Sequence, residues 1–161
     1  NGSINIIYKA FVEDWNRTNA KHLASKVISH STQPIDAIIT SYDGLAMGAI
    51  DALREAGYTD EQISNIVITG QDAELDAVQA INKGLYTLTV YKSIPLISSN
   101  AIEMVARIAA GKKVTSINGE INNGRKDVPS VLLTPGVVDK NSLSVLVNDN
   151  FYTREQIEGS K

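Results

Sequence analysis

The spacing of apolar residues in the middle of the chain predicts a strand, a helix and a second strand. Residues Asn65 to Thr69 form a short β-branched run, and Gly70 allows a sharp turn after it. From Ala73 to Lys83 apolar residues recur at helical spacing, and Gly84 follows as a C-terminal cap. Tyr86 to Lys92 then alternates apolar and polar residues, as a strand does. This unit predicts a parallel sheet.

The same rhythm occurs before this unit. We expect a strand over residues 4–8, a helix capped by Thr18 or Asn19, a strand over residues 35–40, and a helix over residues 45–56. The resulting order, β-α-β-α-β-α-β, is typical of an α/β fold with a doubly wound parallel sheet.

Beyond Lys92 the pattern changes. Pro95 opens a long helix with an apolar stripe that ends at Gly111. Weak strand patterns cover residues 114–121 and 128–133, and Pro129 restricts the second to an edge or a crossover. Pro135 and Gly136 predict a further break in the extended run. Short helices are expected from Asn141 or Ser142 and after Thr153.

Composition narrows the classes of function. With 15 Lys and Arg against 18 Asp and Glu, the chain has no basic footprint for nucleic acid. No window approaches the roughly 18 consecutive apolar residues of a spanning helix. The absence of cysteine excludes disulfides and thiolate chemistry but fits either side of a membrane. Because the chain opens on Asn1, we expect it to be processed, trimmed or an internal piece of something longer.

Candidate ligand-binding residues lie where strands end, since ligands of open parallel sheets bind outside the carboxyl ends of the strands. Four groups qualify: Phe11 with Trp15, Ser41 to Asp43, Gln71 with Asp72, and Tyr91 with Lys92. Aromatic, carboxylate, cationic and hydroxyl groups on one edge suit a small polyhydroxylated ligand, because rings pack on C–H groups and charged groups pair with hydroxyls.

Each of these residues also has a purely structural interpretation. Trp15 could be a partly exposed loop aromatic. Asp43 and Asp72 could cap the helices that follow them, which is the interpretation we favour for Asp43. Lys92 could be a solvated strand end.

The patterns argue against a metal site and against catalysis. Asp72-x-Glu74-x-Asp76 resembles the start of a calcium loop, but Ala77 stands where glycine is needed. His22 and His30 have no cysteine or third ligand near them. No nucleophile elbow or phosphate-binding glycine loop is present. We therefore expect no cofactor, no metal and no enzymatic activity.

Four segments resemble a known family: IDAIITSYDGLAMGAIDAL, VITGQDAELDAVQAINKG, LTVYKSI and NNGRKDVPSVLLTP. They are similar to the C-terminal half of the D-xylose-binding proteins, the periplasmic type I sugar-binding components of ABC transporters. The resemblance runs from about Ile4 to Ile157. It implies two α/β lobes that close on one sugar, with aromatic rings on the sugar ring and polar side chains on its hydroxyls.

The resemblance also assigns roles to individual residues. Trp15 matches the stacking aromatic, Asp72 the carboxylate that accepts from sugar hydroxyls, and Lys92 the donor at the crossover. Tyr42 is a departure, because relatives use the Asn of an Asn-Asp pair where this chain has Tyr42-Asp43. A different or looser sugar specificity is therefore expected.

The family's chain crosses between lobes three times. By resemblance, residues 1–92 are an incomplete C-terminal lobe, residues 93–128 belong to the other lobe, and residues 129–161 return to the first. The N-terminal half of the protein is then missing from this sequence, and we expect it to act as a partner of this chain, either in cis or in trans.

The function implied is an extracytoplasmic protein that delivers xylose or a similar monosaccharide to an ABC permease. It would be periplasmic or extracellular and membrane-associated. Two alternatives keep the fold: a xylose sensor that docks on a receptor histidine kinase, which links it to chemoreception, and the core of a LacI-type repressor. The sequence leaves the choice between permease and kinase open.

Overall fold

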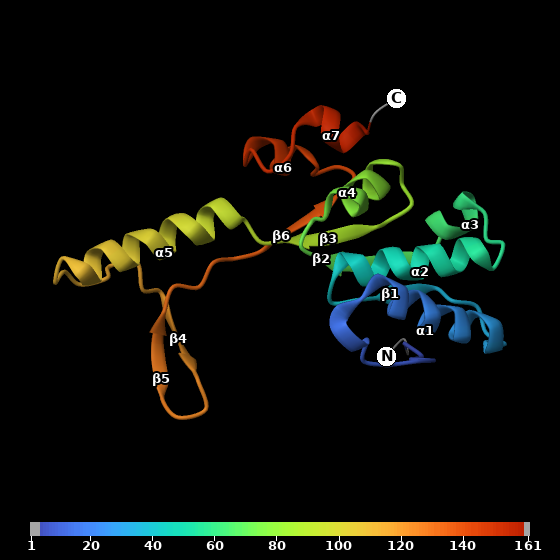
Figure 1. Ribbon diagram of the computed structural model, residues 1–161, viewed down its shortest axis with the longest axis horizontal. Coiled ribbons are helices and arrows are strands. Elements are labelled where there is room, and N and C mark those ends of the chain that lie inside the picture. The colour runs from blue at the N-terminus through green and yellow to red at the C-terminus, as the bar shows by residue number, and fades with distance from the viewer. Residues whose placement is uncertain (1–3, 160–161) are drawn as a thin grey trace. The chain divides into compact units, whose positions relative to one another are not determined.

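The computed structural model describes residues 4–159 (Figure 1). The chain divides into two compact units. The main unit contains Asn1–Tyr91 and Val137–Lys161, and the second unit contains Lys92–Gly136. Each unit is described by itself below.

The main unit is built on a four-stranded sheet with the strand order β1-β2-β3-β6. Its strands are β1 (Ala37–Ile39), β2 (Val67–Gln71), β3 (Leu88–Tyr91) and β6 (Gly136–Asp139). The first three strands are parallel, with Ile38 opposite Ile68 and Gly70 opposite Thr89. The predicted α/β fold with a parallel sheet is confirmed.

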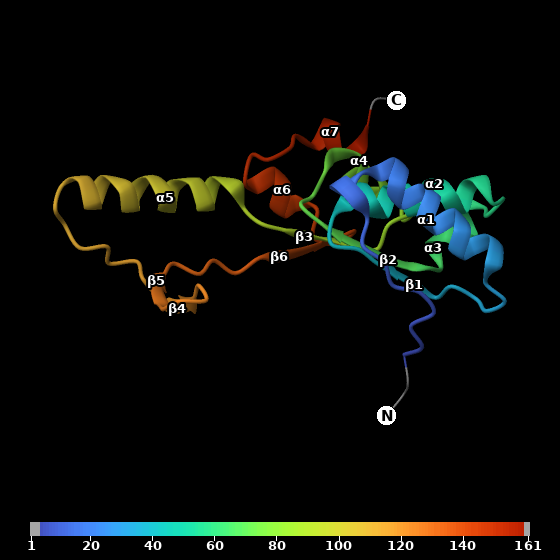
Figure 2. The ribbon, with the colours of Figure 1, turned by 60° about the horizontal axis from the view of Figure 1, so that its bottom comes forward.

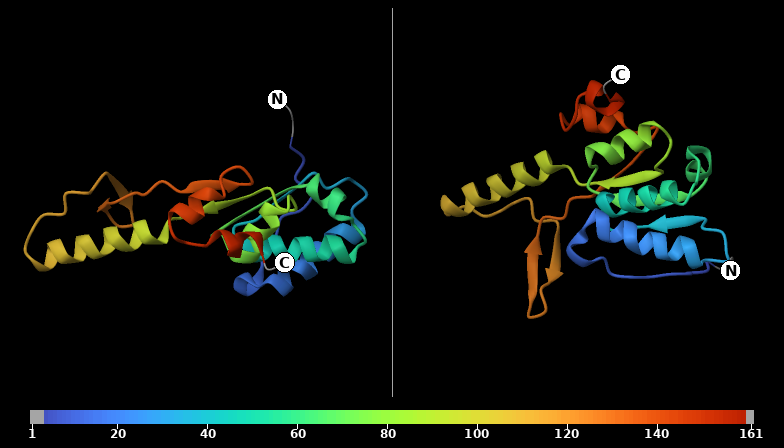
Figure 3. Two further views of the ribbon diagram at one scale, coloured as in Figure 1. Left: turned by 90° about the horizontal axis from the view of Figure 1, so that it is seen from above. Right: turned by 45° about the vertical axis from the view of Figure 1, so that its right-hand side comes forward.

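Seven helices belong to the main unit among the described residues. They are η1 (Glu13–Trp15), α1 (Arg17–His30), α2 (Asp43–Glu55), α3 (Asp60–Ser64), α4 (Leu75–Asn82), α6 (Ser144–Asn148) and α7 (Arg154–Glu158). Helix α1 lies alongside α2, and α7 packs on α4 (Figures 1 and 3). Gly48 allows the first of these contacts, because a Cβ there would overlap the Arg17 carbonyl oxygen and approach Ala20 Cβ to 3.0 Å.

The core lies between the sheet and its helices. One apolar cluster joins α2, α3, β2 and α4 through fully buried side chains, among them Ile50, Leu53, Ile63, Ile68 and Ile81. A smaller cluster joins α4, β3, β6, α6 and α7 through Val78, Tyr91, Val138, Leu146 and Ile157. Helical spacing and strand alternation placed these residues on the inner faces.

Helices α1, α2 and α4 lie on one side of the sheet (Figure 2). On the other side apolar residues remain accessible, since Ile39 is 73% exposed and Val67 is 46% exposed. Parallel sheets are ordinarily covered on both faces. Within the described residues, the sheet of the main unit therefore has one face covered by helices and one uncovered face, which we call the bare face.

The second unit consists of α5 (Ile94–Ala109) and an antiparallel hairpin of β4 (Gly119–Asn122) and β5 (Asp127–Ser130). Ser93 caps α5, as its side chain accepts from the Leu96 amide. No side chain of α5 is buried, and Ile102 on its apolar stripe is 70% exposed. The helix predicted from Pro95 to Gly111 is present, but its stripe is uncovered within this unit.

Three local predictions are wrong. Residues 4–8 form no strand, and the free edge of the sheet at β1 is left unpaired. The fourth strand is β6, which starts at Gly136, where a break was expected. Helix α1 is capped by Asn16, whose side chain accepts from the amides of Thr18 and Asn19, rather than by either of those residues.

Other local features extend or match the predictions. Helix α3 was not predicted; its ends are fixed by a capping box between Thr59 and Gln62. The cap expected at Thr153 is present on α7. Within residues 4–159, no helix combines the length and apolar character needed to cross a membrane.

Candidate functional site

Candidate residues of the main unit gather where β1 and β2 end, at what we call the carboxyl edge. Tyr42 precedes α2 in the loop after β1, and Asp72 follows β2 directly. Trp15 reaches the same edge from η1, the short helix before α1.

The backbone at this edge is unusual. Non-glycine residues with left-handed φ angles include two adjacent pairs, Asp14 with Trp15 and Asp72 with Ala73. Each costs free energy, of order 1–3 kcal/mol, and such residues cluster at functional sites. The φ angle of Asp72 is 97° and that of Trp15 is 51°. The two strained segments therefore carry two of the residues predicted to bind a ligand.

Trp15 lies close to Tyr42. Their ring centroids are 6.2 Å apart and the planes are tilted by 42°, within the range of favourable aromatic pairs. Trp15 remains 55% exposed, so much of its surface is available to a ligand. By contrast, Phe11 in the same loop is 98% exposed. The structure thus distinguishes the two aromatics that the sequence placed together: Trp15 is positioned by its contact with Tyr42, whereas Phe11 packs against almost nothing.

Tyr42 is held from two further directions. Its phenol oxygen donates to Glu74 Oε1 at 2.5 Å, a short hydrogen bond. Its ring lies over Gly44, since a Cβ there would be only 2.5 Å from Tyr42 Cε1. The hydrogen bond to Glu74, burial, and the negative charges of Glu74, Asp72 and Asp43 raise the pKa of Tyr42 to about 12. At neutral pH the phenol therefore keeps its proton.

Asp72 occupies the turn between β2 and α4. Its backbone amide donates to the Val90 carbonyl at 2.9 Å, which fastens the turn to β3. The N-cap of α4 is Glu74 rather than Asp72, and the Asp72 side chain is partly exposed. Its charge also acts on the Tyr42 phenol. The structure therefore brings Trp15, Tyr42 and Asp72 to one edge.

Asp43 does not cap α2, contrary to the interpretation we favoured. It is fully buried, and its carboxylate accepts from Tyr86 Oη at 2.8 Å, from Thr89 Oγ1 at 2.9 Å and from the Glu74 amide at 2.9 Å. Burial raises the pKa of Asp43. Gly70 makes room for this network, because a Cβ there would overlap Tyr86 Oη. Asp43 thus ties α2, β3 and the start of α4 together beneath the candidate site.

Arg17 fixes the helix that follows Trp15. Its guanidinium donates to both oxygens of Asp51 on α2, at 2.8 and 3.0 Å, and to Asp76 Oδ2 on α4 at 2.7 Å. Forked contacts of this kind restrain orientation as well as distance. The start of α1 is therefore held against two other helices, close to the Trp15 ring.

Lys92 follows β3 directly but is the first residue of the second unit, and it is exposed. Its assignment to the sugar site stays a prediction.

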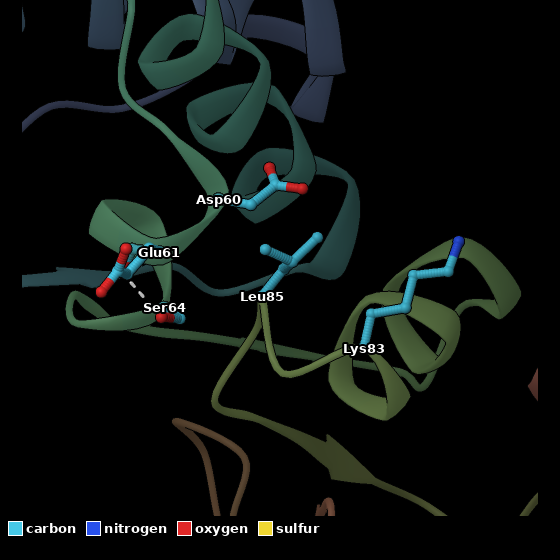
Figure 4. A pocket seen from close by; sticks show the side chains of 5 residues that line it. All are labelled: Asp60, Glu61, Ser64, Lys83 and Leu85. Atoms are coloured by element: carbon cyan, nitrogen blue, oxygen red, sulfur yellow. Dashed lines mark hydrogen bonds between the residues drawn. The ribbon is translucent and has the colours of Figure 1, made fainter.

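A hollow elsewhere on the main unit is a poor alternative site. It is lined by Asp60, Glu61, Ser64, Lys83 and Leu85 (Figure 4). These residues come just before β2 and β3, at the amino ends of the strands, where open α/β sheets seldom bind ligands. The hollow is open and holds no aromatic side chain.

No metal centre is formed by His, Cys, Asp or Glu side chains within the described part of the chain. The run Asp72-x-Glu74-x-Asp76 diverges instead, because Glu74 meets Tyr42 and Asp76 meets Arg17. Sequence reasoning considered Glu74 only as a calcium ligand and so missed its contact with Tyr42. The signal available was its position two residues beyond Asp72, in the same strand-to-helix turn.

Comparison with known proteins defines the class of this protein. A family model described as a periplasmic binding protein domain matches residues 1–113, so the chain belongs to the periplasmic binding protein family. Its fold is that of one lobe of a type I member. It resembles a carbohydrate transporter solute-binding protein from Chloroflexus aurantiacus in complex with D-glucose, with a TM-score of 0.77 and 27% identity over 89% of this chain and 42% of the other.

Two curated relatives place the chain more closely. The D-xylose-binding periplasmic protein of Haemophilus influenzae is 34% identical over 97% of this chain and 46% of its own length. A multiple sugar-binding periplasmic protein of Azospirillum brasilense is 31% identical over 89% of this chain and 41% of its own. The chain spans about half the length of these curated relatives. The resemblance to D-xylose-binding proteins is thereby confirmed.

Proposed function

We propose that this chain forms most of the C-terminal lobe of an extracytoplasmic sugar-binding protein, which delivers D-xylose or a similar monosaccharide to an ABC permease. It would act together with the N-terminal half that the resemblance implies, supplied in cis or in trans. The complete assembly is called the two-lobe protein below. Closure of both lobes on the sugar would produce the conformation that the permease recognises.

The observation that carries the proposal is the convergence of Trp15, Tyr42 and Asp72 at the carboxyl edge. An accessible indole can pack on the C–H face of a sugar, and a partly exposed carboxylate beside it can accept from ring hydroxyls. Strained backbone at both Trp15 and Asp72 supports a functional demand on their positions. Lys92 would add a donor from the crossover after β3.

The division of the chain supports this arrangement. We assign residues 93–128 to the other lobe and residues 129–161 to the return. The second unit, Lys92–Gly136, buries none of its side chains within the described residues, as expected of a segment whose core partners lie in another lobe. The bare face of the main unit's sheet fits the same interpretation.

Titration calorimetry of the two-lobe protein with pentoses and hexoses tests the proposal. Trp15→Ala should weaken binding by roughly 1 to 3 kcal/mol because ring packing is lost. Asp72→Ala should cost more, on the order of 2 to 5 kcal/mol, because a desolvated hydroxyl loses a charged acceptor. Phe11→Ala is the matched control: it removes an aromatic from the same loop and should leave affinity unchanged.

Wild-type affinity in both Trp15→Ala and Asp72→Ala would refute this site. Absence of binding to every sugar would refute the function. Capture of a receptor kinase instead of a permease by the sugar-loaded protein would keep the site but replace the proposed transport role with a sensor.

A further inference from the structure

We propose that Glu74 determines sugar specificity through Tyr42, by accepting the hydrogen bond of the phenol so that Tyr42 presents only an acceptor to the ligand. The inference rests on the proposed function and concerns the same site.

The hydrogen-bonding capacity of each group defines the result. A tyrosine hydroxyl carries one proton and can also accept, whereas an ionised glutamate can only accept. In the Tyr42–Glu74 pair the phenol must therefore donate, and it does so at 2.5 Å. Its single proton is then committed, and only the oxygen lone pairs remain for a ligand. With Asp72 beside it, the edge is rich in acceptors.

The geometry keeps Tyr42 in this state. The missing Cβ of Gly44 lets the ring lie against the first turn of α2, and Trp15 contacts it at a centroid distance of 6.2 Å. Glu74 is fixed in turn, because its backbone amide donates to the buried carboxylate of Asp43 at 2.9 Å. The side chain of Glu74 forms no capping bond on α4, so it is free for Tyr42.

This arrangement differs chemically from an amide at the same position. An asparagine side chain offers both donors and an acceptor. The Tyr42–Glu74 pair instead selects a sugar hydroxyl that donates its own proton. Stereoisomers that turn this hydroxyl away, or analogues that lack it, should be rejected, since a site built for one hydrogen bond discriminates against ligands that cannot form it.

The first measurement is the titration of Tyr42 in the 161-residue chain by NMR with isotope-labelled tyrosine, assigned through Tyr42→Phe. The pKa should be about 12 in the wild type and fall toward 10.0 in Glu74→Gln and Glu74→Ala. Asp72→Asn removes a nearby charge of smaller influence and should lower it less. Glu61→Gln, on α3 at the opposite edge, should not change it. An unchanged pKa in both Glu74 variants would overturn the pairing.

The second measurement uses calorimetry of the two-lobe protein with deoxy and deoxyfluoro analogues of its best sugar. The hydroxyl that meets Tyr42 is the one whose removal no longer matters in Tyr42→Phe. At that position fluorine, which cannot donate, should be as poor as hydrogen in the wild type. In Glu74→Ala the released phenol can donate, and the fluoro analogue should then exceed the deoxy analogue by about threefold or more.

These outcomes separate the inference from the proposed function. If Tyr42→Phe binds every sugar as the wild type does while Trp15→Ala does not, the sugar site stands and the role of Glu74 is refuted. A fluoro analogue that already binds better than the deoxy analogue in the wild type refutes it as well. If the wild type binds no sugar, the proposed function falls and the specificity role falls with it.

Discussion

The main unit and the second unit differ in what they bury. Helix α2 of the main unit has ten buried residues, whereas α5 of the second unit has none, although α5 is the longer helix. Both carry an apolar stripe at helical spacing. The α2 stripe packs against the sheet and α4. In the second unit, the hairpin of β4 and β5 is the only other regular element among the described residues.

This comparison shows that an amphipathic pattern predicts a helix without predicting what covers it. Most of the stability of a helix in a protein comes from packing of its apolar face. The stripe of α5 is therefore a surface of the kind that helices normally bury, and we expect it to contact something outside its own unit. In our proposal that contact is the other lobe, and the following predictions test the contrast, beginning with the largest effect.

Amide hydrogen exchange of the 161-residue chain should separate the two units most strongly. Amides of α2 and β2 should be protected about a thousandfold or more, since they open only with the core. Amides of α5 should exchange almost freely. In the two-lobe protein α5 should become protected. Equal protection of α5 and α2 in the isolated chain would show that the second unit is stable alone.

Core truncation should repeat the contrast. Ile68→Ala removes methyl groups from a fully buried position on β2 and should cost about 2 to 5 kcal/mol in the free energy of unfolding. Ile102→Ala on α5 should change it by no more than about 0.5 kcal/mol in the isolated chain. Urea unfolding measures both. A larger cost at Ile102 would mean that α5 is already packed.

Two glycines provide a backbone version of this test. Gly48→Ala should cost about 1 to 3 kcal/mol despite better helix propensity, because the new methyl group meets the Arg17 carbonyl and pushes α1 away. A methyl group at Gly111 would meet no atom of another residue beyond its chain neighbours within 4 Å, though the φ angle of Gly111 is 66°. Gly111→Ala should therefore leave unfolding of the main unit unchanged. Thermal melting of both variants tests this, and tolerance of Gly48→Ala would contradict the close α1–α2 contact.

The smallest expected effect is a pH dependence specific to the main unit. Burial raises the pKa of Asp43 above its ordinary 3.8, so the folded state binds this proton more tightly than the unfolded chain. Its stabilising contribution is full below pH 3.8 and is lost as pH rises through the folded-state pKa.

Asp43→Asn removes this ionisation. The free energy of unfolding of the wild type minus that of the variant should decrease as pH rises from 3.8 toward neutrality, which urea unfolding at a series of pH values would measure. An increase of this quantity with pH would contradict the sign we assign.

Part of the site followed from the sequence alone. Trp15, Tyr42 and Asp72 could be proposed because residues after parallel strands meet at one edge and because the family motif marks their positions. Their roles in binding remain predictions.

The sequence by itself determined most of the βα rhythm, the parallel sheet and some helix ends, such as the cap of α7 at Thr153, because these depend on local spacing and on local side chains. It could not determine strand pairing: whether residues 4–8 join a sheet depends on a neighbour, and β6 pairs across a long separation in the chain. The roles of Asp43 and Glu74 were likewise decided only by tertiary structure. Their partners, Tyr86, Thr89 and Tyr42, lie more than thirty residues away or on other elements, and a hydrogen bond between such residues leaves no periodic trace in the sequence.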